Sequence, residues 1–242
     1  AIIDRSKCVP INSVCTFLLH PGEELEVSGC ATDPGNDDLT LSWDWDDGAP
    51  SPDTMTSYVV PHDVSENQTH IFEWPGLYWV SFKVFDGDAY TEDRVPVIVT
   101  TVGNRARSEG YWQQQTSLSG KTDFSRLGIE RLLAIVSHMS AVFNEYQDVS
   151  TAEKAYNILS LQQNNGDARL QLDRELLIAW LNFANGAYQY LGLLDTDNDG
   201  AGDKFFHDLM ADAEGISQNS SASKAEIKAQ IKLVHHVKQM TQ

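Results

Sequence analysis

The sequence predicts two domains in succession, an all-β sandwich over residues 1–102 and an all-α domain over residues 103–242. Two observations predict this order. In the first hundred residues, large apolar side chains alternate with polar ones along short segments, which is the period of a half-buried strand. After about residue 105, apolar side chains recur every three or four positions, which is the period of a helix. A chain of 242 residues is long enough for each domain to bury its own core.

Alternation marks the strands of the first domain. Its apolar positions are Leu39, Leu41, Trp43 and Trp45, then Tyr78, Val80, Phe82 and Val84, then Val95, Val97 and Val99. Turn-forming pairs such as Pro21-Gly22, Pro75-Gly76 and Asp86-Gly87 separate these segments. Short strands at this spacing predict an immunoglobulin-like sandwich of two sheets.

Residues 1–20 precede this pattern and mix apolar with polar side chains. Two interpretations fit the segment. It pairs with the sheet edge of a neighbouring chain, which would give the protein a means of assembly. Equally, it folds back as the first strand of its own domain.

Helical periodicity marks the second domain. One apolar stripe runs from Ile129 to Tyr146 and another from Leu172 to Leu191. Ser150-Thr-Ala-Glu153 and Ser223-Lys-Ala-Glu226 have the pattern of a capping box ahead of a helix. Two more helices are expected at 205–216 and 225–240. The sequence therefore predicts about five helices.

The charge of the chain is strongly negative and unevenly distributed. Its formal net charge is −18. Residues 1–100 carry 18 acidic and 4 basic side chains, against 17 and 13 in residues 101–242. Such a surface repels phosphate polyanions and attracts divalent cations, so nucleic acid is not an expected partner. No apolar run approaches the roughly 18–20 residues of a membrane helix, so no membrane insertion is expected. We expect an export signal to have been removed ahead of Ala1.

The three cysteines, Cys8, Cys15 and Cys30, lie within the first 30 residues. Their clustering in one β-domain predicts one intrachain disulfide, which favours an oxidising compartment. The third cysteine is then either buried and inert or bonded to another chain. The expected location is secreted or on the cell surface.

The stretch Gly22 to Gly48 resembles the PKD (polycystic kidney disease) domain family. It contains Ala31-Thr-Asp-Pro-Gly35 and the signature Trp43-Asp-Trp-Asp-Asp-Gly48, with Trp for the family's Phe and Asp for its first Gly. His70-Ile-Phe-Glu-Trp-Pro-Gly-Leu-Tyr-Trp-Val80 and Val84-Phe-Asp-Gly-Asp88 extend the resemblance to about residues 14–100. It implies a seven-strand sandwich that serves surface-layer proteins, adhesins and secreted hydrolases as an accessory or spacer module and is not itself catalytic.

Residues 108–216 resemble a helical module of bacterial and archaeal surface proteins. The resemblance rests on Gly110-Tyr-Trp112 and on the segment Leu181-Asn-Phe-Ala-Asn-Gly186. Where the module has Lys-Asn-His after its Gly-Tyr-Trp, this chain has Gln113-Gln-Gln115. The resemblance implies a surface location and no assigned chemistry.

The segment Asp195-Thr-Asp-Asn-Asp-Gly-Ala-Gly-Asp203 is the sharpest local signal. Carboxylates at alternate positions around a tight turn supply the hard oxygen ligands that Ca²⁺ prefers. The first half matches the EF-hand loop, but Phe206 stands where that loop has a bidentate Glu. The pattern is closer to thrombospondin-type and dockerin-like repeats, in which the last Asp is a ligand. We therefore predict a calcium site formed by Asp195, Asp197, Asp199 and Asp203. The alternative is a solvated acidic loop.

A second, weaker calcium site is predicted at Asp37, Asp44 and Asp86, where turns of the sandwich are expected to converge. The alternative is again a solvated acidic surface. The sequence contains no nucleophile elbow, HExxH pair or phosphate-binding glycine loop, so no catalytic site is predicted and the protein is not expected to be an enzyme. Some aromatic side chains lie on strand faces opposite the core and are candidates for contact with a sugar ring, another subunit or the helical domain: Trp74, Trp79, Phe85 and Tyr90.

These observations lead to two functional hypotheses. The first is a non-enzymatic, calcium-stabilised structural or adhesive protein of the cell surface or matrix, whose partners are other surface proteins or copies of itself. The second is an accessory segment of a secreted hydrolase that binds substrate or glycan through the exposed aromatic side chains.

Overall fold

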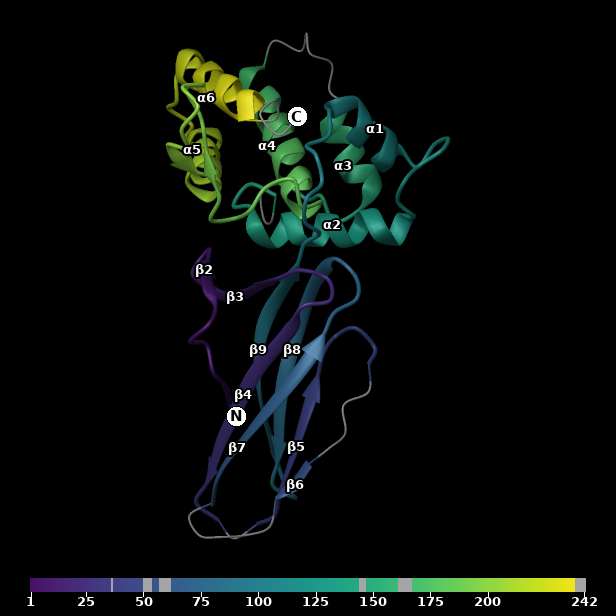
Figure 1. The fold of residues 1–242 in the computed structure, drawn as a ribbon, viewed down its shortest axis with the longest axis vertical. Helices are drawn as coiled ribbons and strands as arrows, with labels where there is room; N and C mark the ends of the chain where they lie inside the picture. Colours follow the sequence, from purple (N-terminus) through teal and green to yellow (C-terminus); the bar gives the residue numbers. More distant parts are fainter. Residues whose placement is uncertain (36, 50–53, 57–61, 144–146, 161–166, 238–242) are drawn as a thin grey trace. The chain divides into compact units, whose positions relative to one another are not determined.

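A computed structural model describes residues 1–35, 37–49, 54–56, 62–143, 147–160 and 167–237. The chain forms two compact units, Ala1–Val99 and Thr100–Gln242. Strands make up the first unit and helices dominate the second (Figure 1). The expected boundary after residue 102 falls in the segment that follows the last long strand.

The first unit contains two sheets. One has the strand order β1-β4-β7 and the other the order β2-β3-β9-β8-β5-β6 (Figure 1). The strands are β1 (Ile2–Ile3), β2 (Val9–Ile11), β3 (Val14–Leu19), β4 (Glu24–Asp33), β5 (Leu39–Asp44), β6 (Thr54–Thr56), β7 (His62–Ile71), β8 (Gly76–Phe85) and β9 (Tyr90–Val99).

The core of this unit lies between the two sheets and follows the predicted alternation. Leu25 and Val27 of β4 belong to the same buried cluster as Val80 and Phe82 of β8. Gly29 lets the sheets approach closely, because a Cβ there would lie 2.7 Å from the ring of Phe82. The apolar positions predicted in β5, β8 and β9 are all buried.

Residues 1–19 fold onto their own sandwich, which is the second of the two interpretations of this segment. Ile2 and Ile3 pair with β4, and β3 runs parallel to β9. Ile3 is buried, and the Arg5 guanidinium donates to both carboxylate oxygens of Asp93 at 2.8 and 2.7 Å. A disulfide joins Cys8 to Cys15 across the β2–β3 hairpin, as the clustering of the cysteines predicted.

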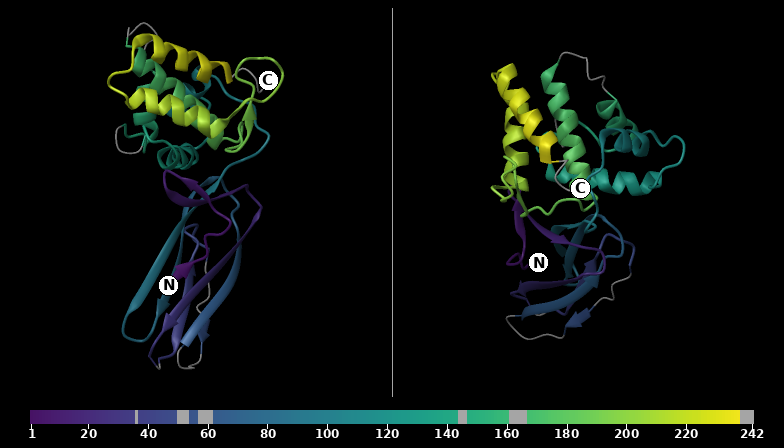
Figure 2. Two further views of the ribbon diagram at one scale, coloured as in Figure 1. Left: turned by 90° about the vertical axis from the view of Figure 1, so that its left-hand side faces the viewer. Right: turned by 45° about the horizontal axis from the view of Figure 1, so that its top comes forward.

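The second unit contains six helices in the part of the chain that the structure describes. They are α1 (Glu109–Ser117), α2 (Arg126–Met139), α3 (Ala152–Leu159), α4 (Ala168–Ala184), α5 (Phe206–Gln218) and α6 (Lys224–Val237). Helix α4 is buried along most of its length, and Figure 2 shows α5 and α6 lying alongside it. None of the described helices is long and apolar enough to cross a membrane.

The predicted capping boxes have different outcomes. Ser223 and Glu226 form one: the Ser223 N–H donates to the Glu226 carboxylate at 2.7 Å, and the Glu226 N–H donates to Ser223 Oγ at 3.3 Å. The other prediction is wrong by one residue, because Thr151 rather than Ser150 caps α3.

The predicted helical stripes extend past the ends of the helices. Helix α2 stops at Met139, and Tyr146 lies outside the described residues, as do positions 238–240 of the last expected helix. Helix α4 ends at Ala184, because Gly186 adopts the left-handed φ of +78°. A Cβ at Gly186 would lie 2.0 Å from the carbonyl oxygen of Thr101.

The second unit is not purely helical. Leu193–Leu194 (β10) and Lys204–Phe205 (β11) form a two-stranded antiparallel ladder between α4 and α5. Two residues per strand are too few for an alternation to be recognised, so the sequence pattern missed this hairpin. The ladder encloses the acidic loop at residues 195–203.

Candidate metal centre

The acidic loop is the connection of the β10–β11 hairpin. The ladder pairs Leu194 with Lys204, and the Asp203 N–H donates to the Leu194 carbonyl at 2.8 Å. Gly202 packs tightly on the same ladder, since a Cβ there would lie 2.8 Å from Leu193 Cβ. The two ends of the loop are therefore held together by backbone pairing.

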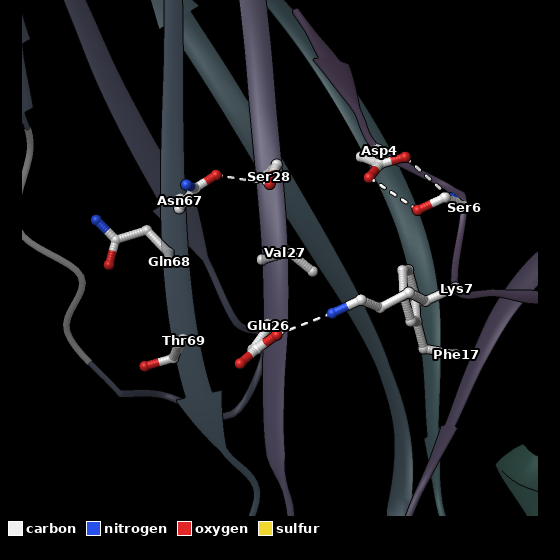
Figure 3. Close-up of a pocket in the computed structure, with 10 residues that line it drawn as sticks. All are labelled: Asp4, Ser6, Lys7, Phe17, Glu26, Val27, Ser28, Asn67, Gln68 and Thr69. Atoms are coloured by element: carbon white, nitrogen blue, oxygen red, sulfur yellow. Dashed lines mark hydrogen bonds and ion pairs between the residues drawn. The ribbon is translucent and has the colours of Figure 1, made fainter.

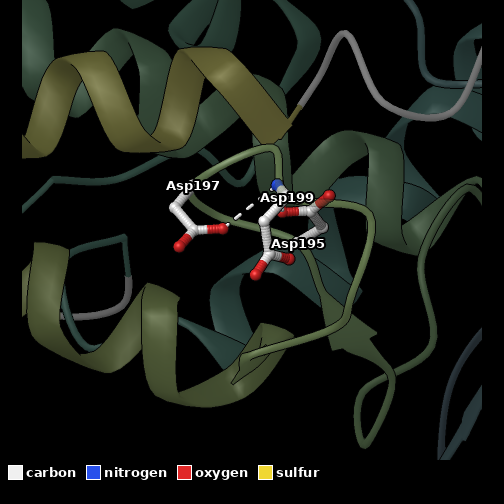
Figure 4. A group of neighbouring side chains, drawn as sticks. All are labelled: Asp195, Asp197 and Asp199. Carbon is white, nitrogen blue, oxygen red and sulfur yellow. Dashed lines mark hydrogen bonds between the residues drawn. The ribbon is translucent and has the colours of Figure 1, made fainter.

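Three of the four predicted calcium ligands come together in this loop. Asp195, Asp197 and Asp199 each offer a carboxylate oxygen, and these oxygens lie within 4.8 Å of one another (Figure 4). Asn198 and Gly200 have positive φ angles of 67° and 92°, which turn the chain tightly enough to bring alternate carboxylates to one side.

Backbone N–H groups fix the first of these carboxylates. The Asp195 carboxylate accepts hydrogen bonds from the N–H groups of Asn198 at 2.6 Å, Asp199 at 3.2 Å and Gly200 at 2.8 Å. Burial alone would raise the pKa of Asp195, but the N–H donors of Gly200, Asn198 and Asp199 outweigh burial and lower it below its ordinary value. The group that opens the loop is therefore held as an anion, which is the form that binds a cation.

The fourth predicted ligand lies elsewhere in the loop. Both carboxylate oxygens of Asp203 accept hydrogen bonds from Thr196, one from its N–H at 3.0 Å and one from its hydroxyl at 2.8 Å. Asp203 is not part of the three-carboxylate group. In this arrangement it closes the base of the loop.

The donor set fits a hard cation. Three carboxylates on one short loop supply oxygen ligands without any nitrogen or sulfur, the combination that suits Ca²⁺ or Mg²⁺ rather than Zn²⁺. Each carboxylate oxygen can accept more than one partner, so the N–H bonds to Asp195 leave acceptor capacity for an ion. The side chains of Asp197 and Asp199 are exposed, so an ion and its waters can enter from solvent.

The second predicted site does not assemble. Asp44 ends β5 and lies opposite Ser81, while Asp86 follows β8 at the other end of the same ladder, beyond the Thr40–Phe85 pair. Five strand positions correspond to about 17 Å, too far for one ion. Asp37 precedes β5 and shares the end of the sandwich where Asp86 lies. The prediction was wrong because it placed turns from both ends of the strands at one end.

The acidic signature at 43–48 has structural contacts instead. Asp46 accepts a hydrogen bond from the Trp79 N–H at 3.0 Å, and Asp47 Oδ2 lies 2.7 Å from the Nε2 of His70. The His70 ring also stacks on Trp45, with 4.5 Å between ring centroids. These contacts join the loop after β5 to β7 and β8.

The two motifs of the helical module contact each other. Trp112 is fully buried, and its indole N–H donates to the Asn182 side-chain oxygen at 3.0 Å. The same oxygen accepts the Arg107 N–H at 2.7 Å, and the Asn182 amide donates back to the Arg107 carbonyl at 3.1 Å. Both Thr101 and Asn104 donate to the Asn185 carbonyl. The motifs therefore fasten residues 101–107 to the end of α4.

Asp173 and Glu214 are two of the buried carboxyl groups of the helical unit, and sequence reasoning missed both. Asp173 accepts from Ser217 and Gln147, and Glu214 accepts from Ser140 and from the Trp180 indole at 2.8 Å. Burial raises the pKa of both groups, against the opposing effect of these donors. Asp173 also lines a cavity of about 460 Å³. An acidic residue in a helical segment is normally assigned to the solvent-exposed face of the helix. The sequence therefore gives no sign that these two are buried.

A pocket of about 340 Å³ lies on the sandwich (Figure 3). Lys7 donates to Glu26 at 2.8 Å on one side, and Ser28 donates to Asn67 at 2.6 Å on the other. Cys30, the unpaired cysteine, is exposed on the same strand as Glu26. Of the two alternatives for the third cysteine, the buried one is thus wrong.

The aromatic side chains expected to leave the core are exposed. Phe85 and Tyr90 are directly opposite each other on β8 and β9, with exposed fractions of 44% and 69%. Trp79 on the same face of β8 and Trp74 before that strand are also exposed.

No protein-family model and no curated protein matches the chain. Among solved structures, it is similar to the PKD domain of an M14-like peptidase from a Thermoplasmatales archaeon, at 19% identity and a TM-score of 0.27. The alignment covers 35% of this chain and 86% of that domain.

Proposed function

We propose that this protein is a non-enzymatic, calcium-stabilised structural or adhesive component of the cell surface or matrix, with an immunoglobulin-like sandwich of the PKD type. The observation that carries the proposal is the hairpin loop on which Asp195, Asp197 and Asp199 converge. Carboxylates this close repel one another, and a cation bound between them attracts each of them and so offsets that repulsion. The loop directly precedes α5, so an ion there stabilises the helical unit.

Three further features support the proposal, two for the extracellular location and one for the structural role. The Cys8–Cys15 disulfide persists best in an oxidising compartment. The acidic composition suits a surface rich in divalent cations. The signature residues of both units, among them His70, Trp112 and Asn182, make structural contacts.

Calcium should stabilise the helical unit, because a ligand that binds only the folded state shifts the unfolding equilibrium. We expect calcium at 100 times its dissociation constant to raise the melting temperature of this unit by roughly 10 °C. The double substitution Asp195→Asn and Asp197→Asn should abolish the shift. The control, Glu24→Gln with Glu73→Gln, removes the same charge from the sandwich and should preserve it. A parent protein whose melting curve is indifferent to chelator contradicts the proposal.

The second candidate is an accessory segment that binds glycan for a secreted hydrolase. The exposed Phe85–Tyr90 pair favours it, since aromatic faces on a sheet can stack on sugar rings. A glycan array on the full chain tests this role. Binding that is lost on Tyr90→Ala and kept on Trp74→Ala would support it, and an array without binding would leave the structural role.

A further inference from the structure

The C-terminal helix presents a basic face. Lys228 and Lys232 are four residues apart on α6, so they lie on the same side of the helix, and Lys224 continues the row. All three are exposed, whereas Ile227 and Val234 are buried on the opposite side. Within the described residues, no ion pair joins these lysines to a carboxylate. We call Lys224, Lys228 and Lys232 the lysine face.

Small residues keep the lysine face accessible. Ala225 and Ala229 each follow a lysine in the sequence and are exposed. The single acid of the helix, Glu226, is bonded to Ser223 at the N-terminus. The face is therefore a row of positive charges about 6 Å apart in a chain of net charge −18.

One end of the sandwich has the opposite character. Asp33 ends β4, and Asp86 and Asp88 occupy the β8–β9 turn. Asp37 and Asp38 lead into β5, whose Thr40 pairs with Phe85 just before that turn. Gly29 of β4 approaches Phe82 of β8 across the core, and each lies four residues before the aspartate at this end, Asp33 or Asp86. We call these five aspartates the acidic tip.

The acidic tip concentrates charge. A Cβ at Gly35 would lie 3.1 Å from an Asp37 carboxylate oxygen and 3.2 Å from both oxygens of Asp33, so these two carboxylates converge around one glycine. The segments 33–38 and 86–89 contain no lysine or arginine. Clustered charges of one sign produce a field that attracts an oppositely charged surface.

We propose that the lysine face of one copy docks on the acidic tip of a second copy of this chain. Charge complementarity selects this occupant, because the chain itself carries a dense acidic surface that matches the row of lysines. Neither surface can pair with its own equivalent, since like charges repel. The contact is thus heterologous and joins copies head to tail, which produces open chains unless a ring closes.

This contact deepens the proposed structural role and rests on it. A surface component that forms head-to-tail chains needs two different complementary surfaces on each copy, and the two units supply one each. The contact is electrostatic, so salt should control it. The screening length falls from about 30 Å at 0.01 M salt to about 3 Å at 1 M.

Sedimentation of the full chain at both salt concentrations, at fixed calcium, tests the contact. We expect the mean mass to be at least twice that of the monomer at low salt and to return to the monomer at high salt. The variants Lys228→Glu/Lys232→Glu and Asp38→Lys/Asp88→Lys should each remain monomeric at low salt. The control, Arg105→Glu/Lys121→Glu, makes the same charge change elsewhere and should associate like the parent.

Mixing the two charge-reversed variants gives the decisive readout. Each variant then carries the surface that its partner lacks, so association should return to at least the parent level, which a misfolded variant cannot produce. A parent that is monomeric at low salt, a lysine variant that still associates, or a mixture that stays monomeric overturns the contact. Binding of heparin by a monomeric parent also overturns it and assigns the lysine face to a foreign polyanion.

The calcium experiment keeps this inference separate from the proposed function. If the parent does not associate at low salt but chelator still lowers its melting temperature, only the head-to-tail contact is overturned. If chelator leaves the melting temperature unchanged but the mixed variants associate, only the calcium role is overturned.

Discussion

At the scale of single residues, the carboxylates of the helical unit fall into two groups whose pKa values shift in opposite directions. Backbone donors lower the pKa of Asp195, whereas burial raises the pKa of Asp173 and Glu214. The lowered pKa favours the ionised form of Asp195, which is the form that binds a cation. The buried pair favours the protonated acid, so these two groups make the fold less stable as the pH rises.

The variant Asp173→Asn should therefore reduce the pH dependence of stability. The raised pKa means that the folded chain keeps a proton that the unfolded chain releases near its pKa of about 3.9. Stability from this group is complete below that pKa and is lost as the pH rises through the folded pKa, by at most about 1.4 kcal/mol per pH unit. Asparagine can accept from Gln147 and donate to Ser217, so it keeps both contacts.

Urea unfolding between pH 4 and pH 8 measures this effect. We expect Asp173→Asn to be more stable than the parent at pH 8 relative to pH 4. The matched variant Glu130→Gln, on the half-exposed side of α2, should follow the parent. If the free energy of unfolding depends on pH in the same way for the parent and for Asp173→Asn, then folding does not raise the pKa of Asp173.

At the scale of elements, the N-terminal strands belong to the sandwich. Ile2 and Ile3 are adjacent on β1, yet Ile3 is 1% exposed and Ile2 is 59% exposed. Ile3→Ala should destabilise the sandwich by about 2–5 kcal/mol, because it leaves a cavity in the core. Ile2→Ala is the matched control and should cost less than about 0.5 kcal/mol. Equal losses measured by denaturant unfolding would place β1 outside the core.

The same contacts predict the behaviour of a chain that lacks residues 1–13. Removal of residues 1–13 would delete the buried Ile3, the Arg5–Asp93 pair and one half of the disulfide. Such a chain should lose several kcal/mol of stability, so loss of association in it would not report on assembly.

The sequence predicted those elements whose periodicity is long enough to measure. Burial of one face produces the alternation in β5, β8 and β9 and the apolar stripe of α2. Such a periodic pattern can be recognised in a single sequence. The β10–β11 ladder, the end of α4 at Gly186 and the split between Asp44 and Asp86 depend on tertiary placement. The clustering of Asp195, Asp197 and Asp199 was predictable because these residues are close together in the sequence. The position of Asp203 depends on its hydrogen bonds with Thr196, which the sequence does not show.

At the scale of the whole molecule, the two units differ in charge and in the means of their stabilisation. The sandwich has a disulfide and a dense excess of negative charge, whereas the helical unit has the acidic loop and a nearly balanced composition. Each unit has its own buried core. Because the units are separate, we expect the helical unit to respond to calcium and the sandwich to respond to salt.

Calorimetry of the full chain should then show two unfolding transitions with different sensitivities. Calcium should raise the transition of the helical unit, because the loop at 195–199 belongs to that unit alone. Monovalent salt should raise the transition of the sandwich more, because screening relieves repulsion among its 18 acidic side chains. Reducing agent should lower the sandwich transition by opening the Cys8–Cys15 link. A single transition that shifts as a whole under all three treatments would mean that the two units unfold as one cooperative body.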